Sequence, residues 1–208
     1  LTELSITRIL VNGAQESLKK QVITLIENAA TEGFSALKAQ ALREKIEDIR
    51  KVKKAFVKFS TDGLVIVNVI ERTEAVVFFN NDQYEVLDSN GVILSIKQNY
   101  EGLSSFPLLV GKDAKKNINA LLALVNEIGS YQSEVLYYEW VGERRWDIHM
   151  KSELVFKLPE NNLNKGLNVM RMFLRETNKM SKTVVSIDLR NIDKPVSYTH
   201  LTLPTMDS

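Results

Sequence analysis

The residues best suited to chemistry lie close together near position 150. Asp147 and His149 are two residues apart in a segment expected to be a strand, so their side chains share one face, and Glu153 follows nearby. Histidine and carboxylate groups bind Zn²⁺ and exchange protons. Outside residues 196–208, however, there is no second histidine, and a catalytic or metal site requires several groups in one geometry. The favoured interpretation is a solvated strand face.

Other signatures of catalysis are missing from the sequence. Gly102, Gly111 and Gly129 lack the spacing of a phosphate-binding loop, and no serine lies in a nucleophile-elbow pattern. There is no cysteine, which excludes disulfides, thiol nucleophiles and thiolate metal sites. We therefore expect no catalytic residue, no cofactor and no metal, and we expect that the protein is not an enzyme.

Arg144 and Arg145 place two adjacent guanidinium groups at the start of an expected strand. Both cannot easily be buried, so at least one should remain available for a carboxylate of a partner through a bidentate contact.

A cluster of basic residues precedes and enters the first expected hairpin. Its members are Arg43, Lys45, Arg50, Lys51, Lys53, Lys54 and Lys58. Glu44, Glu47 and Asp48 lie among them, and the net charge of the 208-residue chain is only +1. A solvated helix and strand face is the favoured interpretation, with proximity to anionic lipid second, and no nucleic-acid partner is expected.

The first seventy residues have the pattern strand, helix, helix, strand, strand. Residues 4–13 are expected to open with a strand, and apolar spacing predicts helices over about 15–30 and 36–49. Alternating apolar residues then predict two strands joined by a tight turn at 61–63, where Asp-Gly supplies positive φ. A three-stranded sheet with two helices on one face would bury both helices.

The rest of the chain is rich in strands. Strands are expected at 75–79, 83–87, 92–95, 135–141, 145–150, 154–158 and 183–189. Two helices are expected, one capped by Asp113 and ending at Gly129, the other containing Leu163 to Leu174. The fold class is therefore α+β, with a mostly antiparallel second part.

The end of the chain is expected to offer an open sheet edge. A last strand should begin at about Asn191, Ile192 and Asp193, and its unpaired backbone groups could accept a partner strand. Residues 196–205, VSYTHLTLPT, resemble the translation of a transposon adapter used in DNA sequencing libraries, so residues 196–208 are set aside as a non-native tail. An irregular C-terminal strand is the alternative.

The motifs taken in order resemble the FtsQ/DivIB family of bacterial cell-division proteins. They are ITRILVNG, KIEDIRKVKKAFVKFSTDGLVIVNVIERTEAVVF, VLDSNGVIL, PLLVG, GERRWDI and VVSIDLR, spread over residues 4–190. The resemblance implies a POTRA domain over 1–72 (β-α-α-β-β) and an FtsQ-type β domain with two helices over 73–195. It also implies an alphaproteobacterial source and an N-terminal transmembrane helix upstream of Leu1, with this region in the periplasm at the division septum.

The resemblance also implies a function. It is that of a noncatalytic divisome scaffold that binds FtsB and FtsL and links septum assembly to septal peptidoglycan synthesis, with no small-molecule substrate. The implied partner-binding residues are Arg144, Arg190, Asn191 and Ile192, although the family commonly has an aromatic residue where Asn191 stands. Two alternatives remain: a POTRA-containing accessory of outer-membrane assembly, and a periplasmic cell-wall hydrolase.

Overall fold

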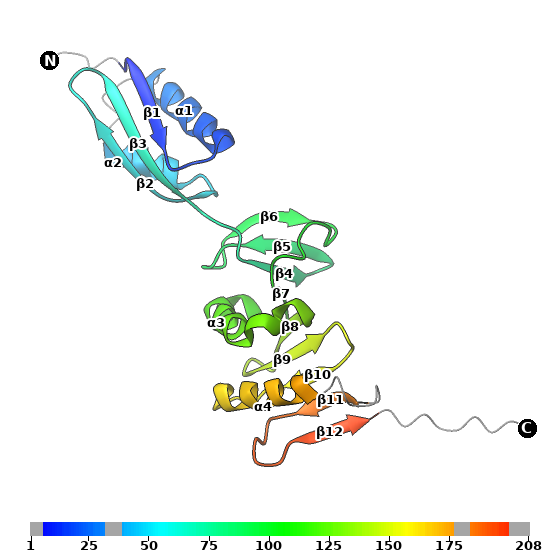
Figure 1. The fold of residues 1–208 in the computed structure, drawn as a ribbon. Helices are drawn as coiled ribbons and strands as arrows, with labels where there is room; N and C mark the ends of the chain where they lie inside the picture. The colour runs from blue at the N-terminus through cyan, green and yellow to red at the C-terminus, as the bar shows by residue number, and fades with distance from the viewer. Residues whose placement is uncertain (1–5, 32–38, 177–183, 200–208) are drawn as a thin grey trace, which may run out of the picture. The chain divides into compact units, whose positions relative to one another are not determined.

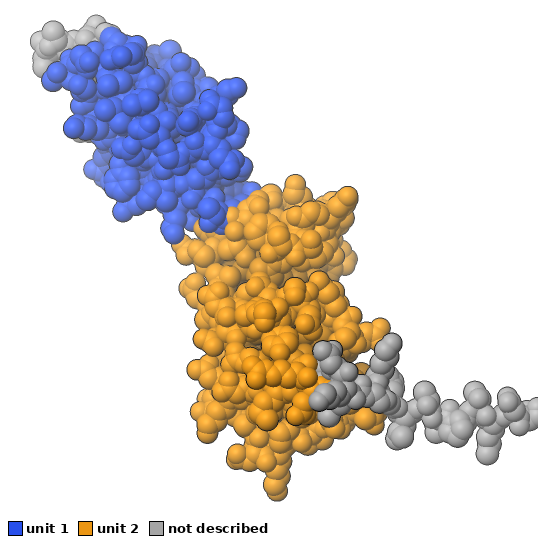
Figure 2. Space-filling model, in the orientation of Figure 1, with its two compact units in different colours: residues 1–73, 92–94 blue, residues 74–91, 95–208 orange. Residues whose placement is uncertain are grey.

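A computed structural model describes residues 6–31, 39–176 and 184–199. The chain divides into two compact units, residues 1–73 with 92–94 and residues 74–91 with 95–208 (Figures 1 and 2). Within the described ranges, no helix combines the length and apolarity needed to cross a bilayer. Expectations that concern residues 1–5, 32–38, 177–183 and 200–208 lie outside the described part of the chain.

The N-terminal unit has the expected order of elements. They are β1 (Arg8–Asn12), α1 (Glu16–Thr31), α2 (Ala39–Glu47), β2 (Val52–Phe59) and β3 (Leu64–Glu71). β3 is the central strand, parallel to β1 and antiparallel to β2. The predicted hairpin turn is present, because Gly63 has a φ of 81° and donates its N–H to the carbonyl of Ser60.

Alternation along the strands places one apolar face of this sheet against the two helices. Ala55, Val65 and Val67 are fully buried on that face. The helix residues buried against them are Leu18, Val22, Ile26, Ala29, Leu42 and Ile46. α1 and α2 lie on one side of the sheet (Figure 1), and none of the described residues of this unit forms a helix over the other side.

The C-terminal unit is built on one nine-stranded sheet. Its strands are β4 (Val76–Asn80), β5 (Gln83–Leu87), β6 (Ile93–Lys97), β7 (Leu108–Val110), β8 (Val135–Val141), β9 (Arg145–Met150), β10 (Val155–Lys157), β11 (Val184–Asp188) and β12 (Val196–Thr199). They lie in the order β12-β11-β10-β9-β8-β7-β4-β5-β6. With the helices α3 (Ile118–Ile128) and α4 (Leu163–Glu176), this confirms the α+β fold class, a POTRA domain followed by a mostly antiparallel β domain.

One row of side chains crosses four strands of this sheet as its core. Tyr138, Ile148, Phe156 and Ile187 are paired in register on β8, β9, β10 and β11, and each is almost completely buried. α3 and α4 contact each other and lie against the sheet (Figure 1). Because side chains alternate along a strand, the neighbouring row must point to the opposite face.

One strand of this unit was not predicted, and one expectation was wrong. No strand was predicted at Leu108–Val110, which forms β7, parallel to both β4 and β8. Asp113 was expected to cap α3, but it precedes a short 3₁₀ helix at Ala114–Asn117, has a φ of 57° and makes no capping hydrogen bond. Its carboxylate instead contacts the ammonium of Lys116 at 2.7 Å.

The short strand β7 depends on a glycine at its end. Gly111 has a φ of 116°, and a Cβ built there would lie 2.4 Å from the carbonyl oxygen of Trp140 on β8. Gly102 also has a positive φ, 75°, but a Cβ there would have no atom within 4 Å.

We expect Gly111→Ala to lower the free energy of unfolding by about 3 kcal/mol, from left-handed strain and steric overlap together. Gly102→Ala, the matched control, should cost about 1 kcal/mol from strain alone. Urea unfolding of both variants measures the difference. Equal losses of stability in the two variants would show that the close approach of β7 to β8 does not restrict the side chain at position 111.

Candidate functional site

The turn between β8 and β9 separates the two adjacent arginines. Gly142 and Glu143 both have a φ of 58°, and the N–H of Arg144 donates to the carbonyl of Val141 at 3.3 Å. The side chain of Arg144 is 61% exposed, whereas that of Arg145 is only 13% exposed. Only Arg144 therefore presents its guanidinium group to solvent.

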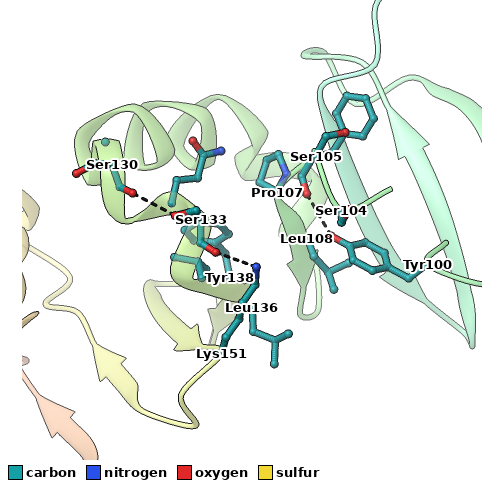
Figure 3. Close-up of a pocket in the computed structure, with 14 residues that line it drawn as sticks. Tyr100, Ser104, Ser105, Pro107, Leu108, Ser130, Ser133, Leu136, Tyr138 and Lys151 are labelled. Carbon is teal, nitrogen blue, oxygen red and sulfur yellow. Dashed lines mark hydrogen bonds between the residues drawn. The ribbon is translucent and has the colours of Figure 1, made fainter. Parts of the chain in front are cut away.

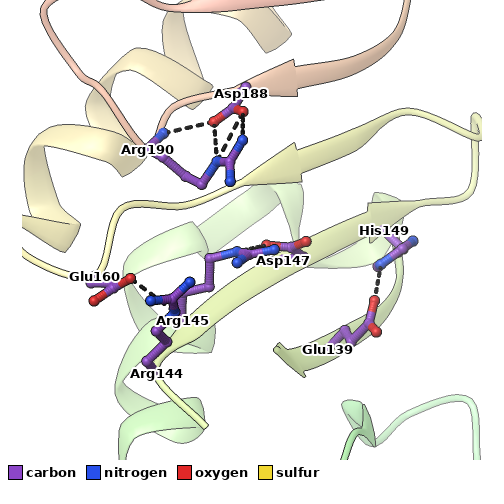
Figure 4. Close-up of polar contacts among 8 residues, drawn as sticks. All are labelled: Glu139, Arg144, Arg145, Asp147, His149, Glu160, Asp188 and Arg190. Carbon is purple, nitrogen blue, oxygen red and sulfur yellow. Dashed lines mark hydrogen bonds and ion pairs between the residues drawn. The ribbon is translucent and has the colours of Figure 1, made fainter. Parts of the chain in front are cut away.

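Arg144 is held by one exposed ion pair. Its Nε lies 3.1 Å from Oε1 of Glu160, a residue that follows β10 (Figure 4). Because both side chains are largely solvated, this pair contributes little to stability and can exchange partners.

Arg190 is fixed more tightly than its sequence position suggests. Its Nε lies 2.9 Å from both carboxylate oxygens of Asp188, and its backbone N–H also donates to Asp188 Oδ1 (Figure 4). These hydrogen bonds lower the pKa of Asp188 and raise that of Arg190. The carboxylate of Asp188 is nearly buried at the end of β11, so the arginine neutralises it there.

The residues after Arg190 form a turn. The N–H of Lys194 donates to the carbonyl of Asn191 at 3.1 Å, and the side-chain oxygen of Asn191 accepts from the N–H of Asp193 at 3.3 Å. The expectation that a strand begins at Asn191 and Ile192 was therefore wrong. Asparagine readily accepts hydrogen bonds from the backbone two residues on, which favours a turn over an extended chain.

One surface pocket brings the predicted partner-binding residues together. Its volume is about 530 Å³, and its lining comprises Pro159, Glu160, Asn161, Asn162, Lys165, Arg190, Asn191, Ile192 and Asp193. Three of the four predicted residues line it, and Glu160 connects it to the fourth, Arg144. The turn after β11, the loop after β10 and the turn after β8 thus meet in one region.

The edge of β11 is covered by β12, which lies in the segment 196–208 that the sequence had led us to set aside as a tail. Val196–Thr199 pairs antiparallel with β11, with Val196 opposite Asp188 and Ser197 opposite Ile187. These four residues, all exposed, therefore extend the sheet, while the non-native origin of residues 196–208 stays a prediction. β12 ends the strand order, so within the described chain its outer edge has no neighbouring strand.

A row of charged residues that crosses the sheet and ends on β11 was not recognised in the sequence. Glu139, Asp147, Lys157 and Asp188 are paired in register on β8 to β11. Burial raises the pKa of Asp147, and the hydrogen bond from Arg145 Nε at 3.1 Å opposes that shift. The sequence did carry a signal for this row, because each charged residue is adjacent in its strand to an apolar core residue and so points to the opposite face.

The candidate catalytic residues do not converge. His149 Nε2 lies 2.8 Å from Oε2 of Glu139, whereas Asp147 contacts Arg145 (Figure 4). Glu153 lies outside the strands, with a φ of 69°. Among the described residues, no three histidine, aspartate or glutamate side chains are grouped to hold a metal ion. The face is not fully solvated either, because Asp147 is only 5% exposed.

A second pocket of about 390 Å³ lies beside the first residues of β7 and β8 (Figure 3). Ser130, Ser133 and Lys151 line one side, where Lys151 Nζ donates to the carbonyl of Ser133 at 2.8 Å. Tyr100 lies on the other side and donates its hydroxyl to the carbonyl of Phe106 at 3.2 Å. The lining contains no carboxylate or imidazole, so it has no acid and base pair.

Comparison with known proteins identifies related sequences. A family model described as cell division protein FtsQ/DivIB, C-terminal, matches residues 75–190. The chain is 25% identical to the cell division protein FtsQ of Bradyrhizobium diazoefficiens, covering 92% of this chain and 56% of that protein. It is 25% identical to FtsQ of Agrobacterium fabrum, covering 88% and 58%, and 26% identical to FtsQ of Rhizobium radiobacter, covering 84% and 82%. The chain thus spans little more than half the length of the first two relatives.

The Asp188 and Arg190 pair should make folding sensitive to acid. Since the pKa of Asp188 lies below its ordinary value of 3.8, its stabilisation is complete above that pH and is lost as pH falls through the lower value. We expect Asp188→Asn to cost about 2 kcal/mol at pH 7, and this cost should shrink as the pH falls below 4. Denaturant unfolding between pH 7 and 2 measures it, with Asp193→Asn in the adjacent turn as control. A cost that does not change with pH would contradict the assignment.

Proposed function

The chain belongs to the FtsQ/DivIB family of cell-division proteins, and from this premise we propose that it is a noncatalytic scaffold of the division machinery. In this proposal it binds FtsB and FtsL and links septum assembly to septal peptidoglycan synthesis. The observation that carries the proposal is the exposed terminal strand β12 beside the pocket formed by Arg190, Asn191 and Ile192.

The proposed binding mode is addition of a partner strand to the sheet. β12 ends the strand order and all four of its residues are exposed, so an extended segment can pair with its free backbone groups. Each main-chain hydrogen bond contributes about 1 kcal/mol net, and side chains in the neighbouring pocket would provide selectivity. We assign this position to the segment of FtsB that follows its coiled coil.

Arg144 would provide a charged contact at the rim of this site. Its guanidinium is exposed, and its present partner Glu160 is solvated, so an acidic side chain of FtsB can replace or share that partner. Arg190 has a different role, because Asp188 already engages two of its nitrogens. It positions the turn that carries Asn191 and Ile192.

The proposed location is the periplasmic side of the cytoplasmic membrane at the division septum. The proposal rests on the family, and it includes an N-terminal membrane anchor. The domain boundaries proposed with it are 1–72 for the POTRA domain and 73–195 for the β domain, followed by the tail 196–208, whose first four residues extend the sheet as β12.

We expect Arg144→Glu to weaken binding of the FtsB segment by about tenfold or more, because it places a like charge opposite an acidic partner. Isothermal titration calorimetry with a synthetic FtsB peptide measures the affinity. Arg175→Glu on α4, an exposed arginine given the same change of charge, should leave the affinity unchanged. Unchanged affinity for Arg144→Glu would remove this residue from the interface.

A charge swap separates a direct contact from a structural one. In Arg144→Glu combined with Glu160→Arg, the internal ion pair can form again with its polarity reversed. We expect this double variant to bind the FtsB peptide as weakly as the single variant does. Restored affinity would show that Arg144 acts only by pairing with Glu160.

A further inference from the structure

The N-terminal sheet has an uncovered face opposite its two helices, called here the outer face. Side chains of β1, β2 and β3 alternate, so each strand contributes every second residue to it. Its members are Arg8, Leu10, Asn12, Lys54, Phe56, Lys58, Leu64, Ile66, Asn68 and Ile70.

This face is unusually apolar for a surface. Leu10, Phe56 and Ile70 are each 48% exposed, and Ile66 lies opposite Leu10 in the strand register. Single exposed apolar residues are ordinary, but neighbouring ones rimmed by polar groups mark interaction surfaces. These residues come from all three strands, and the hydrogen-bonded pair Asn12 and Asn68 lies in the row between that of Leu10 with Ile66 and that of Ile70.

The charges on the outer face have one sign. Arg8, Lys54 and Lys58 are its ionisable residues, and none of the strand residues on it is acidic. The ammonium of Lys54 lies 5.3 Å from the ring centroid of Phe56. Arg8 reaches Asp62 at the hairpin turn only at 4.0 Å, with both side chains mostly exposed. Such a pair is weak and leaves Arg8 available to another carboxylate.

We propose that the outer face binds an amphipathic helix of a partner protein, with an apolar stripe flanked by acidic residues. The acidic flanks would complement the three cations, and the stripe would cover Leu10, Phe56 and Ile70. The opposite face of the same sheet already packs against two amphipathic helices, α1 and α2, so a third helix would complete a three-layer arrangement.

The dimensions of the face suit one helix. β1 and β2 flank β3, so these two outer strands lie about 10 Å apart, which is close to the diameter of a helix. The eight residues of β3 extend over about 26 Å, which corresponds to about 17 residues of helix. An anionic bilayer is the alternative occupant, and binding of phosphatidylglycerol vesicles in the test below separates it from a helix.

The test uses a phage-displayed library of random 18-residue peptides, selected on the whole chain and counter-selected on the Phe56→Glu, Ile70→Glu double variant. We expect enriched peptides with leucine-type residues at helical spacing and flanking aspartate or glutamate. Backbone amide signals of β1 to β3 should shift when a selected peptide binds. The double variant Lys54→Glu, Lys58→Glu should lower the affinity for that peptide at least tenfold.

Two control variants introduce a glutamate outside the outer face. Arg43→Glu on α2 and Met172→Glu on α4 change exposed residues elsewhere and should leave binding unchanged. Circular dichroism melts verify that every variant is folded. Failure to enrich any peptide, enrichment of basic peptides, or binding of phosphatidylglycerol vesicles without peptide binding would overturn the proposal. The test does not involve β12, so it is independent of the FtsB assignment.

Discussion

Every backbone N–H and C=O in a sheet needs a hydrogen-bond partner, and at the last strand of an open sheet the outward groups find it in water or in another chain. The nine-stranded sheet ends at β12, whose residues are exposed. The turn at 190–194 leads into β12 and shares a pocket with the loop after β10, whose Glu160 pairs with Arg144 in the turn after β8. The unpaired edge gives this unit a natural position for a partner chain, and the surrounding side chains determine which chain fits.

The charged row next to the edge shows how two carboxylates can be buried there. Asp147 and Asp188 are each paired with an arginine two residues away, Arg145 on β9 and Arg190 just after β11. Removing such an arginine would leave an uncompensated buried charge. These two arginines are therefore committed to the fold, whereas Arg144, adjacent in sequence to one of them, makes only a solvent-exposed pair with Glu160.

Periodicity predicted most of the fold because long strands and helices carry strong patterns. The N-terminal unit follows its sequence order, and Phe56 alternating with Ala55 already distinguishes an outer from an inner face. β7 was missed because three residues in parallel pairing carry no period of their own. At the site, residue types indicated that at least one of Arg144 and Arg145 stays exposed. Which of the two it is, the capture of Arg190 by Asp188 and the pairing of β12 come only from the structure.

The central claim is that a partner strand pairs with the outer edge of β12, and amide hydrogen exchange over Val196–Thr199 tests it most directly. In the free chain, alternate amides that face β11 should exchange slowly, and those that face outward should exchange quickly. With saturating FtsB peptide, the account predicts that the outward amides also become slow. An exchange pattern in β12 that stays unchanged while the peptide is bound would contradict it.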